Sequence, residues 1–336
     1  MSEQIRWGLI GTGDIARKRI APALRDLPAA RLVAVCRRQA NLAESFAREF
    51  GAPRWYATVP ELFADADVDA VYIATPVHLH AAQTIAGANA GKHVLCEKPM
   101  ALNVAECDEM IAACRANNVA LGVAYYRRFY PAIVRIREIM ASGEIGTVVM
   151  AQINVFEAFN PTGDNPRSWL LNKAQAGGGP MLDYGCHRLE MLVNMFGPVS
   201  QVSSAVGNVV HRREVEDTAI ALLTFELGGY ATLSVTHAAS EAQDTLDIYG
   251  SAGSIHVAAL NEGSVRVTAG SNERMELLPP HTNLHAPLIE EFMEAVRSHR
   301  APAVDGEAGR AVTAIEDQIY ASTPGSNRFA GTGLGR

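Results

Sequence analysis

Hydrophobic positions in the first 120 residues follow two alternating patterns, one typical of buried strands and one typical of helices. Short, almost wholly apolar runs predict strands that are buried on both faces, over residues 5–10, 32–36, 70–74, 94–96 and 120–124. Between them, apolar residues recur every three or four positions and predict helices over 15–26, 42–50, 59–64, 79–90 and 104–117. Strands that alternate with helices imply a doubly wound parallel sheet with helices on both faces.

After residue 125 the pattern changes to strands of alternating polarity, separated by Gly, Asn and Ser turns. These runs predict a mostly antiparallel sheet, over 148–156, 199–209, 218–226, 230–236, 245–249, 254–257 and 264–268. Helices are expected over 131–142, 182–196, 287–298 and 307–321. We therefore expect an α/β domain over 1–124, an α+β domain with a large open sheet over 125–322, and a flexible Gly/Ser-rich tail over 323–336.

Composition narrows the class of protein. A chain of 336 residues suits two domains, and its net charge of −7 offers no basic surplus for nucleic acid. No run of eighteen apolar residues predicts a membrane span, and no secretory signal is expected. The 5 cysteines are scattered, which favours reduced thiols in a cytoplasmic protein and argues against a disulfide framework or a metal site.

The stretch LIGTGDIA follows the first predicted strand and opens the first helix. Its G-x-G-x-x-A pattern allows a tight turn at Gly11, close approach of a pyrophosphate at Gly13, and close helix–strand packing at Ala16. A glycine-rich turn without a ligand is the alternative. We expect the cofactor phosphates to lie against Gly11, Thr12, Gly13, Asp14 and Ile15.

The second strand ends in Cys36-Arg37-Arg38, where NAD binding needs a carboxylate to hold the ribose 2′-hydroxyl. Arg37 and Arg38 can instead clamp a 2′-phosphate, or stack on adenine. The pattern therefore favours NADP, with NAD possible, over a solvated basic turn.

Two further strand ends carry candidate cofactor residues. Thr75 and Pro76 form a turn at the carboxyl edge of the sheet, and His80 is either a cofactor contact or a polar residue of the next helix. Glu97-Lys98-Pro99 follows the next strand, where a lysine can reach the nicotinamide ribose and a substrate hydroxyl. Because a proline restricts the residue before it, the direction of Lys98 is fixed.

The order and spacing of these motifs resemble those of the glucose–fructose oxidoreductase/inositol dehydrogenase (Gfo/Idh/MocA) family over nearly the whole chain. The motifs are GTGDIA, ATPVHLHA, CEKPM, YYRRFYPAI and GGGPMLDYGCHRLEML. The resemblance implies a Rossmann domain for NAD(P), and a second domain whose open sheet serves substrate binding and homodimer or homotetramer contacts. It also implies a catalytic site formed by Lys98, Asp183 and His187.

The helix over 182–196 supports this assignment independently. Asp183 and His187 are four residues apart, so they share a face beside the apolar stripe, and such a His can accept and return a proton. A surface Asp–His pair is the alternative. By the resemblance, the segment with Arg167 and Trp169 forms one wall of the substrate site, so both are substrate-binding candidates. Tyr126 and Arg127 either hold substrate oxygens or are structural residues at the domain junction, and His285 is a weaker candidate.

These residues predict hydride transfer between a nicotinamide cofactor and a carbinol or carbonyl carbon of a sugar, polyol or anhydrosugar. The alternative that the resemblance implies is NAD(P)-assisted glycoside hydrolysis, in which transient oxidation allows elimination. A non-catalytic NADP-sensing regulator ranks lower. Relatives of that kind typically lose the lysine or the histidine of the site, whereas Lys98 and His187 are both present here.

Overall fold

The computed structural model describes residues 4–322, so the predicted tail lies outside the described part of the chain. The chain divides into two compact units. Unit 1 comprises Met1–Phe129 and His281–Thr313, and unit 2 comprises Tyr130–Pro280 and Ala314–Arg336. Compactness thus groups the segment 281–313 with the N-terminal unit, whereas the sequence places it in the second domain. The division into functional domains stays a prediction.

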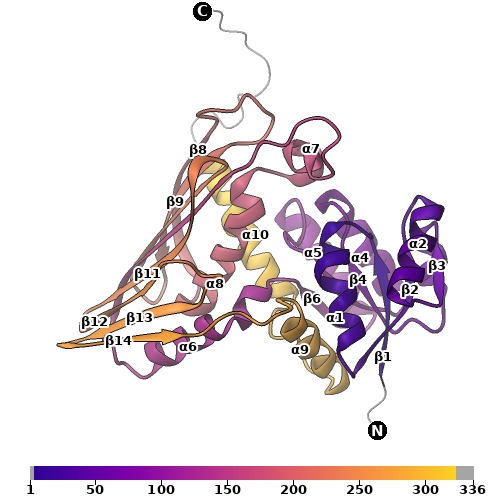
Figure 1. Ribbon diagram of the computed structural model, residues 1–336, viewed down its shortest axis with the longest axis horizontal. Coiled ribbons are helices and arrows are strands. Elements are labelled where there is room, and N and C mark those ends of the chain that lie inside the picture. Colours follow the sequence, from indigo (N-terminus) through magenta and orange to yellow (C-terminus); the bar gives the residue numbers. More distant parts are fainter. Residues whose placement is uncertain (1–3, 323–336) are drawn as a thin grey trace, which may run out of the picture. The chain divides into compact units, whose positions relative to one another are not determined.

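Unit 1 contains a six-stranded sheet with the order β3-β2-β1-β4-β5-β6 (Figure 1). Its strands are β1 (Ile5–Ile10), β2 (Ala30–Cys36), β3 (Arg54–Tyr56), β4 (Ala70–Ile73), β5 (His93–Cys96) and β6 (Leu121–Val123). Its main helices are α1 (Ala21–Asp26), α2 (Ala40–Phe50), α3 (Val59–Phe63), α4 (His80–Asn89), α5 (Val104–Ala116) and α9 (Ala286–Arg297). All described strand pairs of this sheet are parallel, which confirms the predicted fold class.

Local sequence explains these elements. All four residues of β4 are buried, as expected for a strand covered on both faces. Thr58 and Glu61 form a capping box at the start of α3, and Asn103 accepts a hydrogen bond from the backbone N of Glu106 at 3.0 Å at the start of α5. The strand order reverses between β1 and β4, which places the ligand crevice of a doubly wound sheet at their carboxyl ends.

Unit 2 contains an eight-stranded sheet with the order β14-β13-β12-β11-β7-β10-β9-β8. Its strands are β7 (Val148–Ala158), β8 (Val199–Gly207), β9 (Thr218–Phe225), β10 (Tyr230–Thr236), β11 (Ala238–Gly250), β12 (Gly253–Val257), β13 (Ser264–Ala269) and β14 (Asn272–Leu277). The pairing of β7 with β10 is parallel, and the other described pairs are antiparallel. The predicted mostly antiparallel sheet is confirmed.

One face of the unit 2 sheet is covered by helices and the other is open. The helices are α6 (Pro131–Ala141), α8 (Cys186–Phe196) and the later part of α10 (Gly306–Ser322) (Figure 1). Along β9, Ala221 and Leu223 are fully buried, whereas Ile220 and Leu222 on the opposite face are 49% and 44% exposed. The open face therefore keeps apolar side chains in contact with solvent.

Two strands escaped the sequence prediction. β3 has only three residues and no buried one, and β14 alternates exposed and half-buried positions. Neither contains the apolar run that predicts a strand. Among the described residues, no helix has the length and apolar character needed to cross a membrane.

Candidate functional site

The glycine loop joins β1 to the first helical turn at the carboxyl edge of the unit 1 sheet. Gly11 has a φ of 89°, and a Cβ there would lie 2.5 Å from the carbonyl oxygen of Ala74, so only glycine fits. Gly13 is exposed, and a Cβ built on it meets no atom within 4 Å. This open space lies beside the backbone at the start of a helix, where a pyrophosphate can approach.

The other residues of the loop differ in exposure. Thr12 is buried, whereas Asp14 and Ile15 are exposed. The carboxylate of Asp14 pairs with the ammonium of Lys18 at 2.9 Å, so its side chain has a partner within the helix. Only the backbone groups of Asp14 and Ile15 are therefore expected to serve a phosphate.

Arg37 lies against the glycine loop. Its guanidinium donates to the carbonyl oxygen and the hydroxyl of Thr12, both at 3.2 Å, and to Gln39 at 3.3 Å. Arg38, the next residue, is exposed. The structure thus brings one of the two predicted arginines onto the loop and leaves the other at the surface.

His80 ties together two of the predicted cofactor turns. It is buried, and its ring nitrogens lie 2.8 Å from the carbonyl oxygen of Thr75 and 2.9 Å from that of Pro99. Burial lowers the pKa of His80, although both carbonyls act in the opposite direction. A neutral ring donates to one carbonyl at a time. Thr75 and Pro76 stay half-buried at the sheet edge, and a cofactor contact of His80 stays a prediction.

Glu97 is buried beside the half-buried Lys98. Its Oε1 accepts a hydrogen bond from the Tyr72 hydroxyl at 2.8 Å, and its Oε2 accepts one from the backbone N of Lys98 at 3.1 Å. Burial acts to raise the pKa of Glu97, but His285, Lys98 and Tyr72 outweigh it and leave the pKa lowered. The carboxylate therefore stays ionised behind Lys98, and the Lys98–Pro99 bond is cis.

A second layer surrounds this carboxylate within unit 1. The Nε2 atom of His285 lies 3.4 Å from Oε1 of Glu97, and the Tyr126 ring lies over the His285 ring with centroids 4.4 Å apart. The guanidinium of Arg127, which is buried, lies 5.7 Å from the Tyr126 ring centroid. Tyr126 thus lies against His285 and Arg127 lies against Tyr126, and substrate contacts by Tyr126 and Arg127 stay a prediction.

In unit 2, Asp183 and His187 lie on consecutive helical segments. Asp183 belongs to a π-turn, η5 (Met181–Gly185), and His187 to the first turn of α8. Apolar and polar residues of α8 are buried alike, and His187 is 4% exposed. The sequence predicts a regular amphipathic helix with His187 at the core margin; instead, His187 is buried and a π-turn precedes α8. Such π-turns often occur at functional sites.

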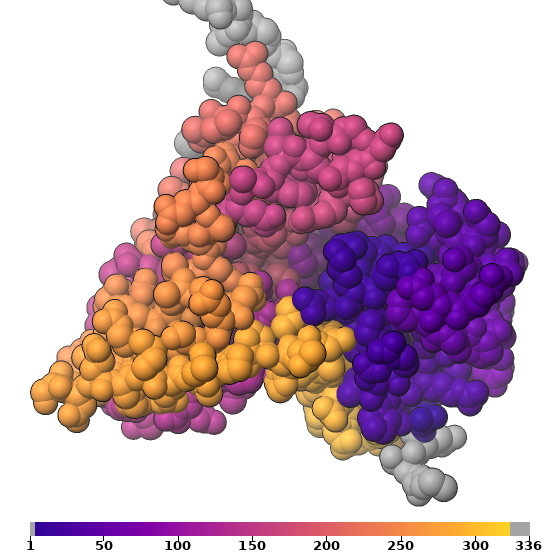
Figure 2. Space-filling model, in the orientation of Figure 1, coloured from indigo at the N-terminus to yellow at the C-terminus, as the bar shows by residue number. Residues whose placement is uncertain are grey.

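Arg167 lies near Asp183. Its Nη2 atom is 3.8 Å from Oδ2 of Asp183, and its guanidinium lies 4.3 Å from the Phe159 ring centroid. Trp169 is half-buried in the next turn, η4 (Ser168–Leu171). The segment around α7 (Lys173–Ala176), which is magenta in Figure 2, forms part of the outer surface. The distance of 3.8 Å between the side chains of Arg167 and Asp183 shows that the structure brings these two predicted residues together.

His237 is a buried residue of this region that carried no sequence motif. Its Nδ1 accepts a hydrogen bond from Arg213 at 2.8 Å, and its ring lies 4.8 Å from Phe159 and 5.1 Å from Tyr184. Burial lowers the pKa of His237 to about 4, so the ring is neutral near pH 7. The Tyr184 hydroxyl donates in turn to Glu157. In the sequence, the only sign of His237 is that it lies between two strands, β10 and β11.

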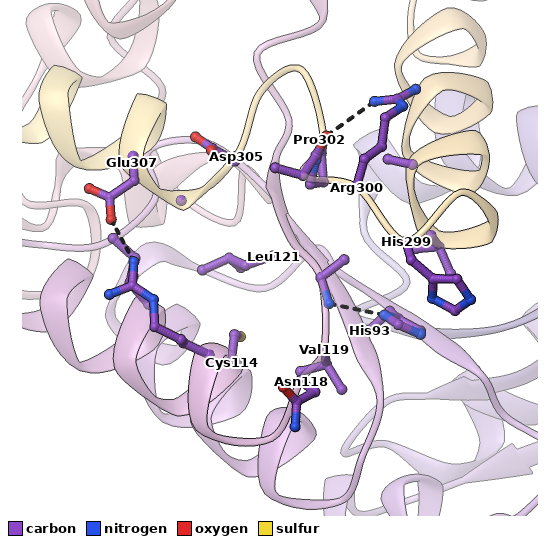
Figure 3. A pocket seen from close by; sticks show the side chains of 17 residues that line it. His93, Cys114, Asn118, Val119, Leu121, His299, Arg300, Pro302, Asp305 and Glu307 are labelled. Atoms are coloured by element: carbon purple, nitrogen blue, oxygen red, sulfur yellow. Dashed lines mark hydrogen bonds and ion pairs between the residues drawn. The ribbon is translucent and has the colours of Figure 1, made fainter.

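A cavity of about 480 Å³ lies elsewhere in unit 1 (Figure 3). It opens where β5 and β6 begin, at the sheet edge opposite the glycine loop, and none of the predicted site residues lines it. The backbone N of Ala120 donates to Nδ1 of His93 at 3.0 Å, and Arg115 pairs with Glu307 at 3.2 Å across α5 and α10. This cavity is therefore separate from the cofactor crevice.

The two groups of residues have complementary chemistry. Unit 1 offers a phosphate-approachable loop and a lysine at one sheet edge, which fits a nicotinamide dinucleotide. Unit 2 offers a carboxylate, an imidazole and a guanidinium, which can bind hydroxyl groups and move a proton. Among the described residues, no cluster of His, Cys, Asp and Glu could hold a metal ion.

Two family models match the chain. The model of an oxidoreductase family with an NAD-binding Rossmann fold matches residues 5–125. The model of the GFO/IDH/MocA C-terminal domain matches residues 133–256. The two matches together cover well over half of the chain.

Individual relatives span almost the same length. The 1,5-anhydro-D-fructose reductase of Ensifer adhaerens is 32% identical over 311 residues, which is 90% of this chain and 92% of the relative. The trans-1,2-dihydrobenzene-1,2-diol dehydrogenase of Mus musculus is 36% identical over 281 residues, which is 82% of this chain and 80% of the relative.

Solved structures share the fold. Levoglucosan dehydrogenase in complex with NADH has a TM-score of 0.88 at 23% identity, and the match covers 96% of this chain and 98% of that one. At this identity the likeness shows the fold alone. The aldose-aldose oxidoreductase from Caulobacter crescentus, complexed with glycerol, has a TM-score of 0.87 at 27% identity and covers 95% of this chain and 97% of that one.

Proposed function

Because the chain belongs to the Gfo/Idh/MocA family of oxidoreductases, we propose that it transfers hydride to or from a carbinol or carbonyl carbon of a sugar, polyol or anhydrosugar, with a preference for NADP. The observation that carries this proposal is the half-buried Lys98, fixed beside the buried carboxylate of Glu97 at the sheet edge that also holds the glycine loop. A cation at this edge suits the reactive end of a bound dinucleotide.

In the oxidation direction, His187 removes the hydroxyl proton and Lys98 donates a hydrogen bond to the same oxygen, which stabilises its developing negative charge. Asp183 fixes the tautomer of His187 or binds a neighbouring hydroxyl. Arg167 and Trp169 contact the substrate, and Tyr126 and Arg127 complete its surroundings. When bound, the nicotinamide cofactor supplies the hydride chemistry.

The preference for NADP rests on Arg37. Its guanidinium lies on the glycine loop through Thr12, close to where a Rossmann fold binds the adenosine ribose. No carboxylate follows β2 in Cys36-Arg37-Arg38, so a 2′-phosphate has a cationic partner and a 2′-hydroxyl lacks its usual acceptor. NAD remains the second cofactor to test, since the matching family model is described as NAD-binding.

An anhydrosugar or aldose is the substrate class that we propose. The support is the reductase of 1,5-anhydro-D-fructose among the relatives, together with the polar set of Arg167, Asp183 and His187. Substrate hydroxyl groups match these donors and acceptors.

We also propose a homodimer or homotetramer formed through the open face of the unit 2 sheet. The apolar side chains of Ile220, Leu222, Tyr230 and Met275 are all more than two-fifths exposed, which is a typical feature of an interface. The five cysteines are buried, and none of them forms a disulfide within residues 4–322. Reduced thiols of this kind support our proposal of a cytoplasmic location.

The experiment that tests the activity is a panel of aldoses, anhydrosugars and cyclic polyols assayed at 340 nm with NADP⁺ and NAD⁺, and of carbonyl sugars assayed with NADPH. A steady absorbance change with any of these substrates supports a dehydrogenase or reductase. Turnover of glycosides without net absorbance change would show transient oxidation and hydrolysis instead. Cofactor binding with no turnover on any substrate would point to a sensor.

A further inference from the structure

A buried carboxylate in unit 2 holds the backbone that leads into the Asp183 turn. Glu216 precedes β9 and is 4% exposed. Its Oε2 accepts a hydrogen bond from the backbone N of Gly179 at 2.8 Å, and its Oε1 accepts one from the backbone N of Met181 at 3.2 Å. The hydroxyl of Tyr320 in α10 also donates to Oε1, at 2.8 Å.

The glycine run of this segment is shaped to the same two side chains. A Cβ on Gly178 would lie 2.1 Å from the Tyr320 hydroxyl oxygen, and a Cβ on Gly179 would lie 2.1 Å from the carbonyl oxygen of Glu216. Real Cβ atoms do not approach other atoms this closely. The glycines are therefore needed for close contact with Glu216 and Tyr320, which is a different role from the flexibility that a glycine run suggests.

The held segment continues directly into the proposed catalytic residues. The backbone N of Asp183 donates to the carbonyl oxygen of Gly179 at 2.9 Å. Met181, whose backbone N bonds Glu216, is the first residue of the π-turn, and α8 with His187 follows that turn. A shift of Gly179 or Met181 thus moves the start of the turn and with it both side chains.

We infer that Glu216, together with Tyr320, is a positioning residue that sets the placement of Asp183 and His187 through the backbone of Gly179 and Met181. The inference rests on the proposed function of Asp183 and His187. Glu216 touches none of the reacting atoms and acts only through this backbone.

The environment of Glu216 shows why its hydrogen bonds matter. Burial raises the pKa of Glu216, although the bonds from Gly179, Tyr320 and Met181 act in the opposite direction. A carboxylate removed from water is unfavourable unless its oxygens are occupied. The three donors supply that compensation, and they also fix the segment from which they come.

The test uses Glu216→Gln, Glu216→Leu and Tyr320→Phe in the full chain. An amide offers one acceptor oxygen to a site built for two, and leucine offers none. The loss of kcat should therefore be smallest in Tyr320→Phe, larger in Glu216→Gln and largest in Glu216→Leu. We expect a fall of about tenfold to a hundredfold for Glu216→Gln, as for a small misplacement of catalytic groups. KM and the cofactor Kd should change less than threefold, roughly, since binding groups are retained.

The neighbouring residue provides a matched control. Asp217 is also buried, and its carboxylate accepts hydrogen bonds from the backbone N atoms of Val209, Val210 and His211, at 2.8, 2.8 and 2.7 Å. Asp217→Asn therefore disturbs a buried carboxylate that holds a different loop, residues 209–211, and not the segment before Asp183. At a temperature where both variants are folded, kcat should fall in Glu216→Gln and stay near the wild-type value in Asp217→Asn.

A double-mutant cycle completes the test. If Glu216 acts through His187, Glu216→Gln should lower kcat no further in a His187→Ala background, and the same holds with Asp183→Asn. Multiplied effects, or equal losses of kcat in Glu216→Gln and Asp217→Asn, would overturn the inference. Full turnover in both His187→Ala and Asp183→Asn would refute the proposed function of those two residues. Any loss of kcat in Glu216→Gln would then have to arise through other residues, and the inference would fail as well. Should Glu216→Leu fail to fold, Tyr320→Phe and Glu216→Gln decide.

Discussion

The imidazole of His285 lies beside the carboxylate of Glu97, the residue before the proposed catalytic lysine, with Nε2 3.4 Å from Oε1 of Glu97. The two residues are far apart in the sequence, and both belong to unit 1. His285 is 1% exposed and Glu97 is 7% exposed. The segment that returns to unit 1 after the unit 2 sheet therefore completes the surroundings of the buried carboxylate next to Lys98.

Replacing His285 should destabilise the protein through Glu97. When a buried carboxylate loses a hydrogen-bonding partner, the folded state is destabilised by about 1–3 kcal/mol. His285→Leu should therefore lower the free energy of unfolding by that amount. His285→Gln keeps an N–H donor near the carboxylate and should lower it less. Urea unfolding of the three proteins measures the difference. A His285→Leu variant as stable as the wild type would show that the two side chains do not interact.

The free energy of unfolding at acidic pH should depend on the ionisation of Glu97. The pKa of Glu97 is lowered in the folded state, so its contribution is present above the unfolded value, about 4.3, and is lost as the pH falls through the folded value. Glu97→Gln removes this contribution. Between about pH 5 and pH 3.5 the wild type should lose free energy of unfolding more steeply than Glu97→Gln. Parallel curves in urea titrations would contradict the lowered pKa.

The two glycines of the loop should separate folding from cofactor binding. At Gly11 the positive φ and the close Ala74 carbonyl make alanine unfavourable, and Gly11→Ala should lower the free energy of unfolding by more than about 2 kcal/mol. At Gly13 a Cβ meets nothing, so Gly13→Ala should change that free energy by less than about 0.5 kcal/mol. The methyl group of the new alanine would occupy the space through which the pyrophosphate approaches the loop, so the NADP Kd should rise about tenfold or more. Tryptophan fluorescence titration gives Kd, and an unchanged value for Gly13→Ala would place the phosphates elsewhere.

Cofactor choice should depend on Arg37. Loss of a charge-assisted contact to a 2′-phosphate costs about 1.5–3 kcal/mol, so Arg37→Ala should lower kcat/KM for NADP about tenfold to a hundredfold. The value for NAD should change little, because NAD has no 2′-phosphate. Arg31→Ala, which removes an exposed arginine of β2, is the control and should leave both values unchanged. Equal losses with both cofactors would show that Arg37 supports the loop through Thr12 and does not select NADP.

The sequence predicts the fold well where hydrophobic pattern and motif coincide. The parallel strands of unit 1 and the glycine loop follow from apolar runs and the G-x-G-x-x-A spacing. The pattern fails at β14, whose polar residues pair only because β13 lies beside them. It also gives no sign of the π-turn at Met181–Gly185, since Glu216 and Tyr320, which hold that segment, are distant in the sequence.

The candidate site shows the same limit. Motifs single out Lys98, Asp183 and His187 because each lies in a recognisable local pattern. His237 has no such pattern, and the sequence offers His285 only as a weak substrate-binding candidate. The places of both depend on Arg213 and Glu97, which only the folded chain brings to them. Long-range partners of buried polar groups are therefore the part that sequence reasoning does not supply.

The assignment of the general base is tested most directly at His187. If His187 takes the hydroxyl proton, His187→Ala should lower kcat by about two to four powers of ten. The nucleotide contacts that we propose lie in unit 1, whereas His187 belongs to unit 2, so the NADPH Kd should stay within about twofold of the wild-type value, as expected when a group acts only on the reacting atoms.

Lys98→Met is the companion variant, because it removes the ammonium and keeps a side chain of similar length. It should lower kcat and, if Lys98 also contacts the nicotinamide ribose, raise the NADPH Kd. The two variants thus differ in cofactor affinity although both lose turnover. Single-turnover measurements with NADPH separate the chemical step from product release. Wild-type turnover in His187→Ala would mean that another group accepts the proton, and the role assigned to the Asp183 turn would then fail with it.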